Sequence, residues 1–358
     1  MTKEYRKELI FVNSFRGSGI GDFGWKLKEE FAKHLHTRYL EIKPSWSGLI
    51  FLWKQLGHKN FNVVFNVGFT SFGKSIYKNF LNFLIIGFFS VVHIRPSVIL
   101  HDSIDTSDLE TTGYSDSFLM PIGGMLATKM LKYCNIFVFS LRYRDILEKK
   151  YGFNSVRYYP FPCEKSEILE CYNKNGNPLL LSVGYVSPYK GLDILPEIRQ
   201  RLNGIETMIV GSFYKSLLLT KNGAKFKAKF VKMAKRGGIT MPGYIDDTRL
   251  MELVKEHCTI AVLPYISGHN ASYSAIFFVT LGIPVVATDI DVFSESRDNG
   301  AGIILVNRNA ESFALEISRL ITSPNIIENL VNLDRKYCEQ YSMNNFCNFV
   351  LSVIKDTK

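Results

Sequence analysis

The sequence predicts an α/β protein built from two Rossmann-like domains. Short apolar runs of strand length alternate with segments of helical periodicity along the 358 residues. The first apolar run leads into a glycine-rich loop and then a helix, which is how a Rossmann-like unit begins. A polar stretch at 161–177 divides the chain, and the same alternation resumes after it. We therefore place a domain boundary in that stretch, with domains at 1–165 and 178–340.

Composition fits a globular protein with an anionic partner. Hydrophobic residues make up 46% and charged residues 21%, so a chain of this length can build two cores. The net charge of +10 points to a nucleotide, a phospholipid surface or nucleic acid. No helix-turn-helix, zinc or aromatic RNA-binding motif is present, which argues against nucleic acid.

Cysteine and histidine spacing predicts neither a metal site nor a disulfide framework. The six cysteines are far apart, with no Cys-x-x-Cys pair, and only His34 and His36 are close enough to suggest paired ligands. The first residues, MTKEYRKELIFVNS, contain no apolar core of signal-peptide length. We expect reduced thiols, a cytoplasmic location, and neither a metal nor any other cofactor.

The first half of the chain predicts alternating strands and helices. The predicted strands lie at 9–13, 40–42, 62–67, 97–100, 136–139 and 156–159, and the predicted helices at 23–36, 120–131 and 142–151. The loop RGSGIGD at 16–22 departs from the dinucleotide fingerprint, and no acidic residue ends the second strand. A nicotinamide cofactor is therefore not expected. The glycines either let the backbone approach a substrate or simply form a tight turn.

The second half repeats this alternation, with predicted strands at 179–183, 207–210, 260–263, 284–288 and 303–306. The stretch PLLLSVGYVSPYKGLDIL at 178–195 predicts a strand ending at Gly184, a loop, and a helix from about Leu192. Lys190 would lie beside the start of that helix, where unpaired N–H groups and the ammonium favour phosphate oxygens. The alternative is an ordinary strand-to-helix turn with a surface lysine.

Several segments together resemble the family 4 glycosyltransferases of the GT-B fold. In the second half they are GYVSPYKGLD at 184–193, Val-Gly at 210–211, PGYI at 242–245 and AVLPYISGHNASYSAIFFVTLGIPVVATD at 261–289, with Glu295 beyond. The first half contributes the glycine loop, His101 after a strand, and the segment 133–162. The tail YSMNNFCNFVLSVIK from Tyr341 is similar to the family's last helix. The resemblance implies two Rossmann-like domains with a cleft between them, and a helix at 341–358 that returns to the first domain.

The resemblance also implies a function. Family members are retaining enzymes that use nucleotide-sugar donors without a metal, and their acceptors include glycans and lipid-linked molecules. It assigns Lys190 to the donor pyrophosphate, where a lysine can neutralise charge on the leaving group. The donor-binding residues that it implies are Gly184, Lys190, Gly211, Tyr244, Ile245, Ser272, Tyr273, Ser274 and Glu295.

This chain departs from the family pattern at two places. Many relatives carry an arginine upstream of the loop lysine, where this chain has Tyr185 and Ser187. Many also carry two glutamates eight residues apart, at the positions of His269 and Phe277 here. A subset with Pro-Tyr and a serine-rich turn is closer, and in it the serines would cap the helix and offer N–H groups to phosphate; the alternative for them is a plain helix cap.

The resemblance places the acceptor site in the first domain. Its implied residues are Gly17, Ser18, Gly19, His101 and Asp102. A retaining transfer needs no strong base, because the departing phosphate can accept the proton, so hydrogen bonding is the expected role of His101. A structural histidine at a strand end is the alternative.

Two segments bear on membrane docking. FLNFLIIGFFSVV at 80–92 is apolar but too short to span a bilayer, so it is either a buried helix or an interfacial one. The segment 215–236 has eight cations and no acid, and predicts a basic amphipathic helix with Phe226, Phe230 and Met233 on its apolar side. Together they favour docking on an anionic membrane, although a solvated helix face explains the second segment as well.

Two other functions stay open. A GT-B nucleotide-sugar epimerase would turn over donor without acceptor. A catalytically impaired scaffold would explain Phe277 and the missing arginine.

Overall fold

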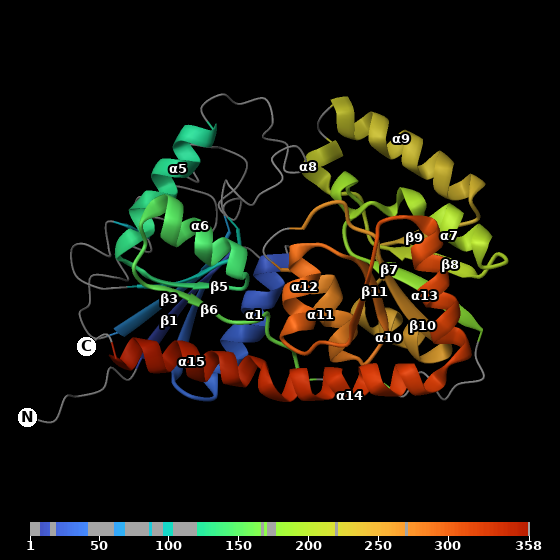
Figure 1. Ribbon diagram of the computed structural model, residues 1–358. Coiled ribbons are helices and arrows are strands. Elements are labelled where there is room, and N and C mark those ends of the chain that lie inside the picture. The colour runs from blue at the N-terminus through green and yellow to red at the C-terminus, as the bar shows by residue number, and fades with distance from the viewer. Residues whose placement is uncertain are drawn as a thin grey trace, which may run out of the picture. The chain divides into compact units, whose positions relative to one another are not determined.

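The computed structural model describes residues 8–14, 19–41, 61–68, 86–87, 96–102, 120–165, 168–169, 177–218, 221–268 and 271–356. These residues fall into two compact units (Figure 1). Described residues up to Tyr159, and again from Met343, form the first unit, and Pro160–Ser342 form the second. Among the described residues, the chain passes from one unit to the other at 159–160 and returns at 342–343, whereas the sequence placed these changes at 165–178 and 340–341.

The first unit contains a parallel sheet of six strands. In spatial order the strands are β2 (His36–Glu41), β1 (Glu8–Asn13), β3 (Phe61–Val67), β4 (Ser97–Leu100), β5 (Asn135–Val138) and β6 (Val156–Tyr158). The order reverses at β1, because β2 and β3 pair with opposite edges of that strand. In sheets of this kind, ligands bind beyond the carboxyl ends of the strands at such a reversal.

The described helices of this unit are α1 (Gly19–Ala32), α5 (Met120–Met130), α6 (Leu141–Tyr151) and α15 (Met343–Asp356). Helix α1 buries Phe23, Leu27 and Phe31, which lie four residues apart on one face. Both ends of α1 lie four residues earlier than the predicted helix at 23–36. It starts earlier because part of the glycine loop forms its first turn, and it ends earlier because His36 pairs with Glu8 in the sheet.

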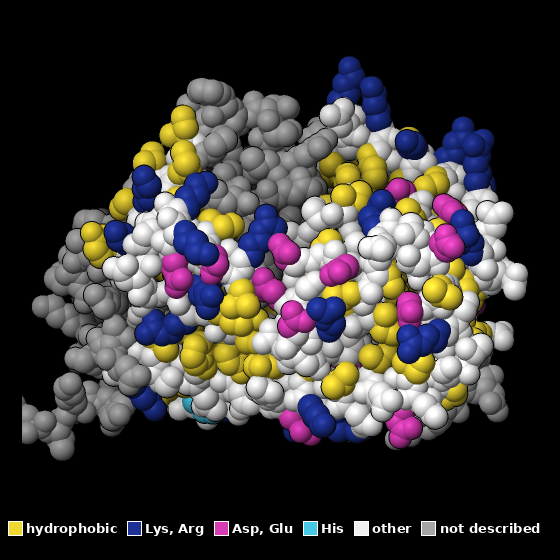
Figure 2. Space-filling view, in the orientation of Figure 1, with side chains coloured by type: hydrophobic (Ala, Val, Ile, Leu, Met, Phe, Trp, Pro, Cys, Tyr) yellow, Lys and Arg dark blue, Asp and Glu magenta, His cyan; other side chains and the backbone are white. Residues whose placement is uncertain are grey.

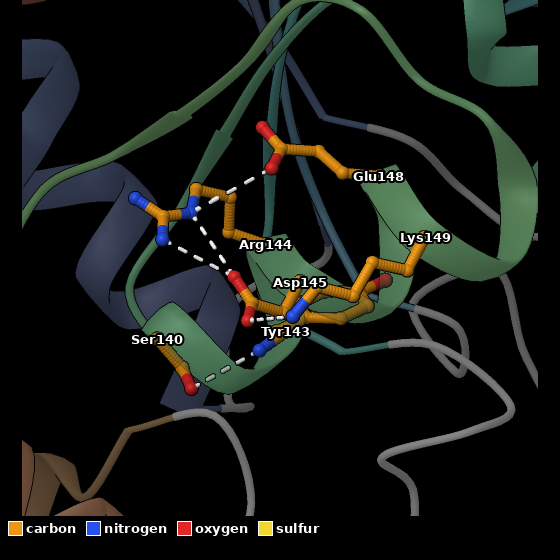
Figure 3. A network of polar contacts seen from close by, with 6 residues as sticks. All are labelled: Ser140, Tyr143, Arg144, Asp145, Glu148 and Lys149. Carbon is orange, nitrogen blue, oxygen red and sulfur yellow. Dashed lines mark hydrogen bonds and ion pairs between the residues drawn. The ribbon is translucent and has the colours of Figure 1, made fainter.

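Helix α6 shows how local sequence sets the ends of an element. At the start of α6, the Ser140 hydroxyl accepts a hydrogen bond from Tyr143 N (Figure 3). Gly152 ends the helix with a left-handed φ of 66°. On its exposed side, Asp145 pairs with Lys149 and Arg144. The hydrogen bonds from Lys149 and Arg144 lower the pKa of Asp145 below its ordinary value.

The last helix belongs to the first unit. Helix α15 packs against α1. Phe346, Cys347 and Val350 are fully buried, and the Phe346 ring contacts the rings of Phe139 and Tyr159. The first unit is thus completed by residues from the far end of the sequence.

The second unit contains another parallel sheet of six strands. Their spatial order is β12 (Ile303–Val306), β11 (Val285–Thr288), β10 (Cys258–Leu263), β7 (Pro178–Val183), β8 (Glu206–Val210) and β9 (Thr240–Gly243). Neighbouring strands are parallel throughout. Here the order reverses between β7 and β10. Strand β9 was not predicted, because it is a four-residue edge strand that contains Pro242 and ends at Gly243.

The helices of this unit are α7 (Leu195–Arg201), α8 (Lys215–Leu218), α9 (Lys221–Arg236), α10 (Asp247–Glu256), α11 (Tyr273–Thr280), α12 (Asp291–Asp298), α13 (Ala310–Thr322) and α14 (Pro324–Gln340). Helix α7 packs on α13, and α11 packs on α14. A core cluster joins Leu180, Ile260 and Val286 of the sheet to Phe230 of α9 and Phe313 of α13. The predicted fold class, α/β with two Rossmann-like domains, is confirmed.

One local prediction was wrong. The chain after Lys190 is not yet an α-helix: Pro188–Lys190 and Leu192–Ile194 are single 3₁₀ turns, and α7 starts at Leu195. Gly191 lies between the two turns with a left-handed φ of 58°, which interrupts the helical path. Lys190 therefore does not lie at an α-helix N-terminus.

Of the apolar segment 80–92, only Ile86 and Gly87 lie among the described residues. Ile86 is buried in the first unit's core, and a Cβ on Gly87 would collide with the backbone oxygen of Met130. These two residues are therefore packed inside the unit. Within the described part of the chain, no helix is both long and apolar enough to cross a membrane.

Candidate functional site

Lys190 lies at the strand-order reversal of the second unit. It follows β7, and its side chain returns to the end of that strand, where Nζ donates to Val183 O at 3.0 Å. It also donates to Ser274 Oγ of α11, which follows β10, at 3.3 Å. The Ser274 hydroxyl in turn donates to Val183 O at 2.9 Å. The ammonium thus joins the carboxyl end of β7 to the first turn of α11.

Two glycines make room for this arrangement. Gly184 has a φ of 105°, and a Cβ there would lie 2.7 Å from Lys190 Nζ. Gly211, at the end of β8, has a φ of 144°, and a Cβ there would collide with the backbone oxygen of Gly184. Both positions therefore require glycine, which explains why the motif carries it there.

Lys190 is a buried charge. The residue is 5% exposed, and its Nζ lies 5.1 Å from the centroid of the Tyr265 ring. Across the described residues, no carboxylate forms an ion pair with Lys190. A buried cation held only by neutral groups is costly unless an anion completes its surroundings.

The Lys190 charge changes the pKa of the Tyr265 hydroxyl. Burial acts to raise its pKa, but the charge of Lys190 and hydrogen bonds with Lys190, Ser274 and Ser272 outweigh that effect. The pKa of Tyr265 therefore lies below its ordinary value. The Ser187 hydroxyl, also buried in the Lys190 loop, has no hydrogen-bond partner in the part of the chain that the structure describes.

The serine-rich turn begins α11, as the sequence predicted. The Ser272 hydroxyl accepts from Ala275 N at 3.2 Å and caps the helix. Ser274 contacts Lys190, whereas the Tyr273 hydroxyl donates to Glu164 at 2.8 Å. Of these three residues, Ser274 is the one in direct contact with Lys190. Phe277 lies inside α11, and His269 lies outside the described residues.

Arg308 is a member of this cluster that the sequence did not reveal. It follows β12, and its Nε donates to Pro264 O at 3.1 Å. Its Nη2 donates to Gly191 O at 3.2 Å and to Asp193 Oδ1 at 2.6 Å. One guanidinium thus fixes the Lys190 loop against the loop after β10. A lone arginine after a strand carries no sequence signal for such a role.

Three other predicted donor residues lie on neighbouring elements. Tyr244 and Ile245 form the loop between β9 and α10, and Tyr244 is 73% exposed. Glu295 is half-buried within α12. Tyr185, where many relatives have arginine, is exposed and packs against Tyr214 with ring centroids 5.2 Å apart.

The first unit has its own polar cluster at the strand-order reversal. Asn13 ends β1, Asn66 lies near the end of β3, and His101 follows β4. Asn66 Nδ2 donates to Asn13 Oδ1 at 2.8 Å, and Asn66 Oδ1 lies 2.8 Å from His101 Nε2. Asn13 Nδ2 donates to Gly21 O in the first turn of α1. A Cβ on Gly24 would collide with both asparagine amides, so this glycine makes room for the pair. The asparagines were not among the predicted site residues.

His101 is neutral at physiological pH. Burial of the ring, which contacts Phe23 and Phe139, lowers its pKa from 6.5 to about 3. Because Asn66 Oδ1 is an acceptor, His101 Nε2 carries the proton, and Nδ1 has a lone pair that accepts hydrogen bonds. A neutral imidazole with so low a pKa is a weak base and no acid, which fits a hydrogen-bonding role.

The remaining predicted acceptor residues are partly covered by the structure. Asp102 lies over Gly68, where an added Cβ would lie 2.6 Å from Asp102 Oδ1. Gly19 is the first residue of α1 and has open space around it. Gly17 and Ser18 lie outside the described residues. Among the residues that are described, no group of three His, Cys, Asp or Glu side chains could hold a metal.

Comparison with known proteins identifies the second unit. Residues 165–338 match the family model described as glycosyl transferases group 1. These residues form a glycosyltransferase domain of that family. No curated protein sequence matches the chain.

Solved structures extend the similarity to the fold of both units. Sucrose-phosphate synthase from Thermosynechococcus elongatus is 12% identical with a TM-score of 0.71, over 98% of this chain and 99% of that one. HepE of Anabaena, solved with UDP, is 12% identical with a TM-score of 0.67, over 98% of this chain and 100% of that one. TarM of S. aureus is 14% identical with a TM-score of 0.61, over 86% of this chain and 58% of that one. The glycosyltransferase domain is thus the second half of a GT-B fold.

Proposed function

We propose that this glycosyltransferase is a retaining, metal-independent enzyme that moves a sugar from a nucleoside-diphosphate sugar to a glycan or lipid-linked acceptor. The observation that carries the proposal is the buried Lys190 ammonium, held by neutral groups at the strand-order reversal of the glycosyltransferase domain. A pyrophosphate would supply the missing negative charge, and Lys190 would stabilise the leaving nucleoside diphosphate.

In this proposal the donor binds along the carboxyl ends of β7, β8 and β9. Gly184 and Gly211 let phosphate approach the backbone, while Ser272, Tyr273 and Ser274 present the first turn of α11. Tyr244, Ile245 and Glu295 would contact the nucleoside and the sugar. Since HepE has been solved with UDP and with UDP-glucose, UDP-sugars are the first donors to test.

The first unit would bind the acceptor through Gly17, Ser18, Gly19, His101 and Asp102. Neutral His101 would form a hydrogen bond with a sugar hydroxyl of the acceptor. The acceptor proton would leave on the departing phosphate, since no strong base is needed in a retaining transfer.

Nucleotide binding and the Lys190→Met variant test the donor site. A nucleoside diphosphate at ten times its dissociation constant should add about 1.4 kcal/mol to the free energy of unfolding. Lys190→Met, which keeps most of the volume but removes the charge, should slow transfer at least about tenfold, or roughly 1.4 kcal/mol of barrier. Lys336→Met, at an exposed position of α14, is the matched control. Normal turnover by Lys190→Met would contradict the proposal.

The same assays separate the alternatives. A scaffold would show no thermal shift with UDP, GDP or ADP. An epimerase would convert the donor without acceptor. For a transferase, the product anomer, read by NMR, decides between retention and inversion, and loss of turnover in EDTA that manganese restores would overturn metal independence.

We also propose that the protein docks on an anionic membrane surface, but through the charges of α9 and not through its apolar side. The apolar side of α9 is not available to lipid, because Phe230 is buried in the core and Phe226 and Met233 pack against it. Its lysines instead face solvent, and Figure 2 shows these cations gathered over α9. Docking would therefore be electrostatic, at about 1 kcal/mol per lysine near the surface.

Vesicle flotation tests this part. Replacing Lys225, Lys229 and Lys232 with glutamine should weaken binding to anionic vesicles more than tenfold. Replacing Lys255, Arg319 and Lys336 removes the same charge from other helices and is the control. If wild-type protein floats with neither anionic nor neutral vesicles, membrane docking is wrong and a soluble acceptor remains.

A further inference from the structure

Two cysteines of the second unit lie in direct contact although they are far apart in sequence. The Cys163 and Cys338 sulfurs are 2.9 Å apart, although the two residues are 175 positions apart in the sequence. Cys163 is 1% exposed, and Cys338 in the last turns of α14 is partly exposed. A small reagent from solvent can therefore reach Cys338, whereas Cys163 is shielded from solvent.

The backbone keeps these sulfurs together. Cys163 N donates to Tyr341 O at 2.8 Å, and Cys163 forms an isolated parallel bridge with Ser342. The Tyr337 hydroxyl, one turn before Tyr341, donates to Phe161 O at 3.1 Å. These contacts hold the backbone at Phe161 and Cys163 against the end of α14. The backbone therefore keeps the two cysteines next to each other.

The two thiols differ in acidity. The hydrogen bond between the two thiols lowers the pKa of Cys338. The same hydrogen bond, together with burial, raises the pKa of Cys163. The thiolate forms more easily on Cys338, which is also the sulfur nearer to solvent, and a thiolate is the reactive form of cysteine.

Asp334 lies one turn before Cys338 on the same helix. It is fully buried, and burial raises its pKa well above the ordinary value even though Gly302 N donates to its Oδ1 at 2.7 Å. Its carboxyl is therefore more readily neutral than an exposed one. A neutral carboxyl opposes the Cys338 thiolate less than a carboxylate would.

We propose that Cys163 and Cys338 are a modification site that hydrogen peroxide converts reversibly into a disulfide. The Cys338 thiolate attacks one peroxide oxygen, the O–O bond breaks, and a sulfenic acid and hydroxide form. The Cys163 sulfur then displaces the sulfenic oxygen, the S–S bond forms, and its proton joins that oxygen to leave as water. Two thiols lose two electrons in total, and one peroxide is reduced to two waters.

The Cys163–Cys338 disulfide would link the place where the chain enters the second unit to the place where it leaves that unit. Cys163 lies just after the chain enters this unit, and Cys338 lies just before it leaves. A cross-link between them closes nearly the whole unit into one covalent loop, which lowers the entropy of the unfolded chain. The oxidised unit should therefore resist heat better than the reduced one.

Peroxide titration of the full chain tests the proposal. Peptide mass spectrometry without reductant should find a Cys163–Cys338 disulfide, and a thiol reductant should reverse it. Oxidation should raise the melting midpoint by about 5 to 10 °C in the wild type. Cys163→Ser and Cys338→Ser should each abolish this increase, and Cys258→Ser, a partly exposed cysteine outside the pair, should keep it.

Other products would overturn the proposal. If peroxide carries Cys338 to sulfinic acid, or joins it to a different cysteine, Cys163 is not its partner. An unchanged thiol count at Cys163 and Cys338, while Cys258 is oxidised in the same sample, would show that the pair is inert. If both serine variants unfold when purified, the peptide map of the wild type still decides the outcome.

Discussion

A Cβ atom on Gly184 would lie 2.7 Å from the ammonium nitrogen of Lys190. Because glycine has no side chain, position 184 leaves room for the buried Lys190 ammonium at the end of β7. The same glycine has a φ of 105°, which other residues rarely adopt.

Gly184→Ala tests two effects of this glycine, the space it leaves for the Lys190 ammonium and its left-handed backbone conformation. The backbone strain alone should cost about 1 to 2 kcal/mol of unfolding free energy. Gly300→Ala is the matched control, because Gly300 has a similar φ of 101° but nothing within 4 Å of the added Cβ. Both variants should lose comparable stability in denaturant melts, but only Gly184→Ala should lose nucleotide-induced stabilisation. Equal nucleotide shifts in the two would disconnect the Lys190 position from the ligand.

Arg308→Lys tests the guanidinium that fixes the Lys190 loop. The single nitrogen of a lysine cannot occupy both positions from which Arg308 Nε and Nη2 donate, so the unfolding free energy should fall by about 1 to 2 kcal/mol. Arg297→Lys, at an exposed ion pair with Asp298, should change it by less than about 0.5 kcal/mol. Denaturant melts measure both. A similarly small loss in the two variants would mean that Arg308 is an ordinary surface arginine.

Asn66→Asp should make activity depend on pH through His101. In the wild type the folded pKa of His101 is about 3, so the ring is neutral from pH 4 to 8. A carboxylate at position 66 would raise that pKa, and imidazolium would form as the pH falls, which removes the Nδ1 lone pair. Activity of the variant should therefore fall toward acidic pH more steeply than that of the wild type. In a His101→Gln background the Asn66→Asp substitution should add no such slope.

The stability of the protein should also depend on His101. Its folded pKa is depressed below the ordinary 6.5, so its contribution is complete above about pH 6.5 and is lost as the pH falls toward 3. Melts of wild type against His101→Gln should show the wild type losing relative stability across that window. A constant difference across it would contradict the assignment of a neutral ring.

Asp334→Asn should change stability with the opposite sign of pH dependence. Because burial raises the folded pKa of Asp334, the wild type loses stability as pH rises from the ordinary 3.8 through the folded value. The variant keeps the acceptor for Gly302 N but cannot ionise. Its stability relative to wild type should therefore increase between pH 4 and pH 8 in thermal melts. Asp298→Asn, an exposed control, should show no such trend.

The sequence predicted most of the sheet framework, because buried parallel strands are continuous apolar runs. Strand β9 was not predicted, because Pro242 and Gly243 are typical of a turn and are tolerated in a sheet only at an edge. The helix after Lys190 was placed too early, because Leu192, Leu195 and Ile198 keep helical spacing across the left-handed Gly191. Apolar spacing reports which side chains are buried and not how the backbone turns between them.

The candidate site was less predictable than the fold. Lys190 and Ser274 were found through motif resemblance, but Arg308, Asn13 and Asn66 were not. Arg308 acts on carbonyl groups distant in sequence, and each asparagine looks like an ordinary polar residue at a strand end. Their roles arise from tertiary contact alone, which single residue types do not encode.

The position of α15 has a consequence for biosynthesis. The first unit needs Phe346, Cys347 and Val350 to cover its aromatic residues, yet these residues are translated after the whole of Pro160–Ser342. The nascent first unit must therefore wait, with Phe139 and Tyr159 uncovered, while all of Pro160–Ser342 is translated. That interval is when a chaperone would find most to bind, and the second unit can finish folding before the first.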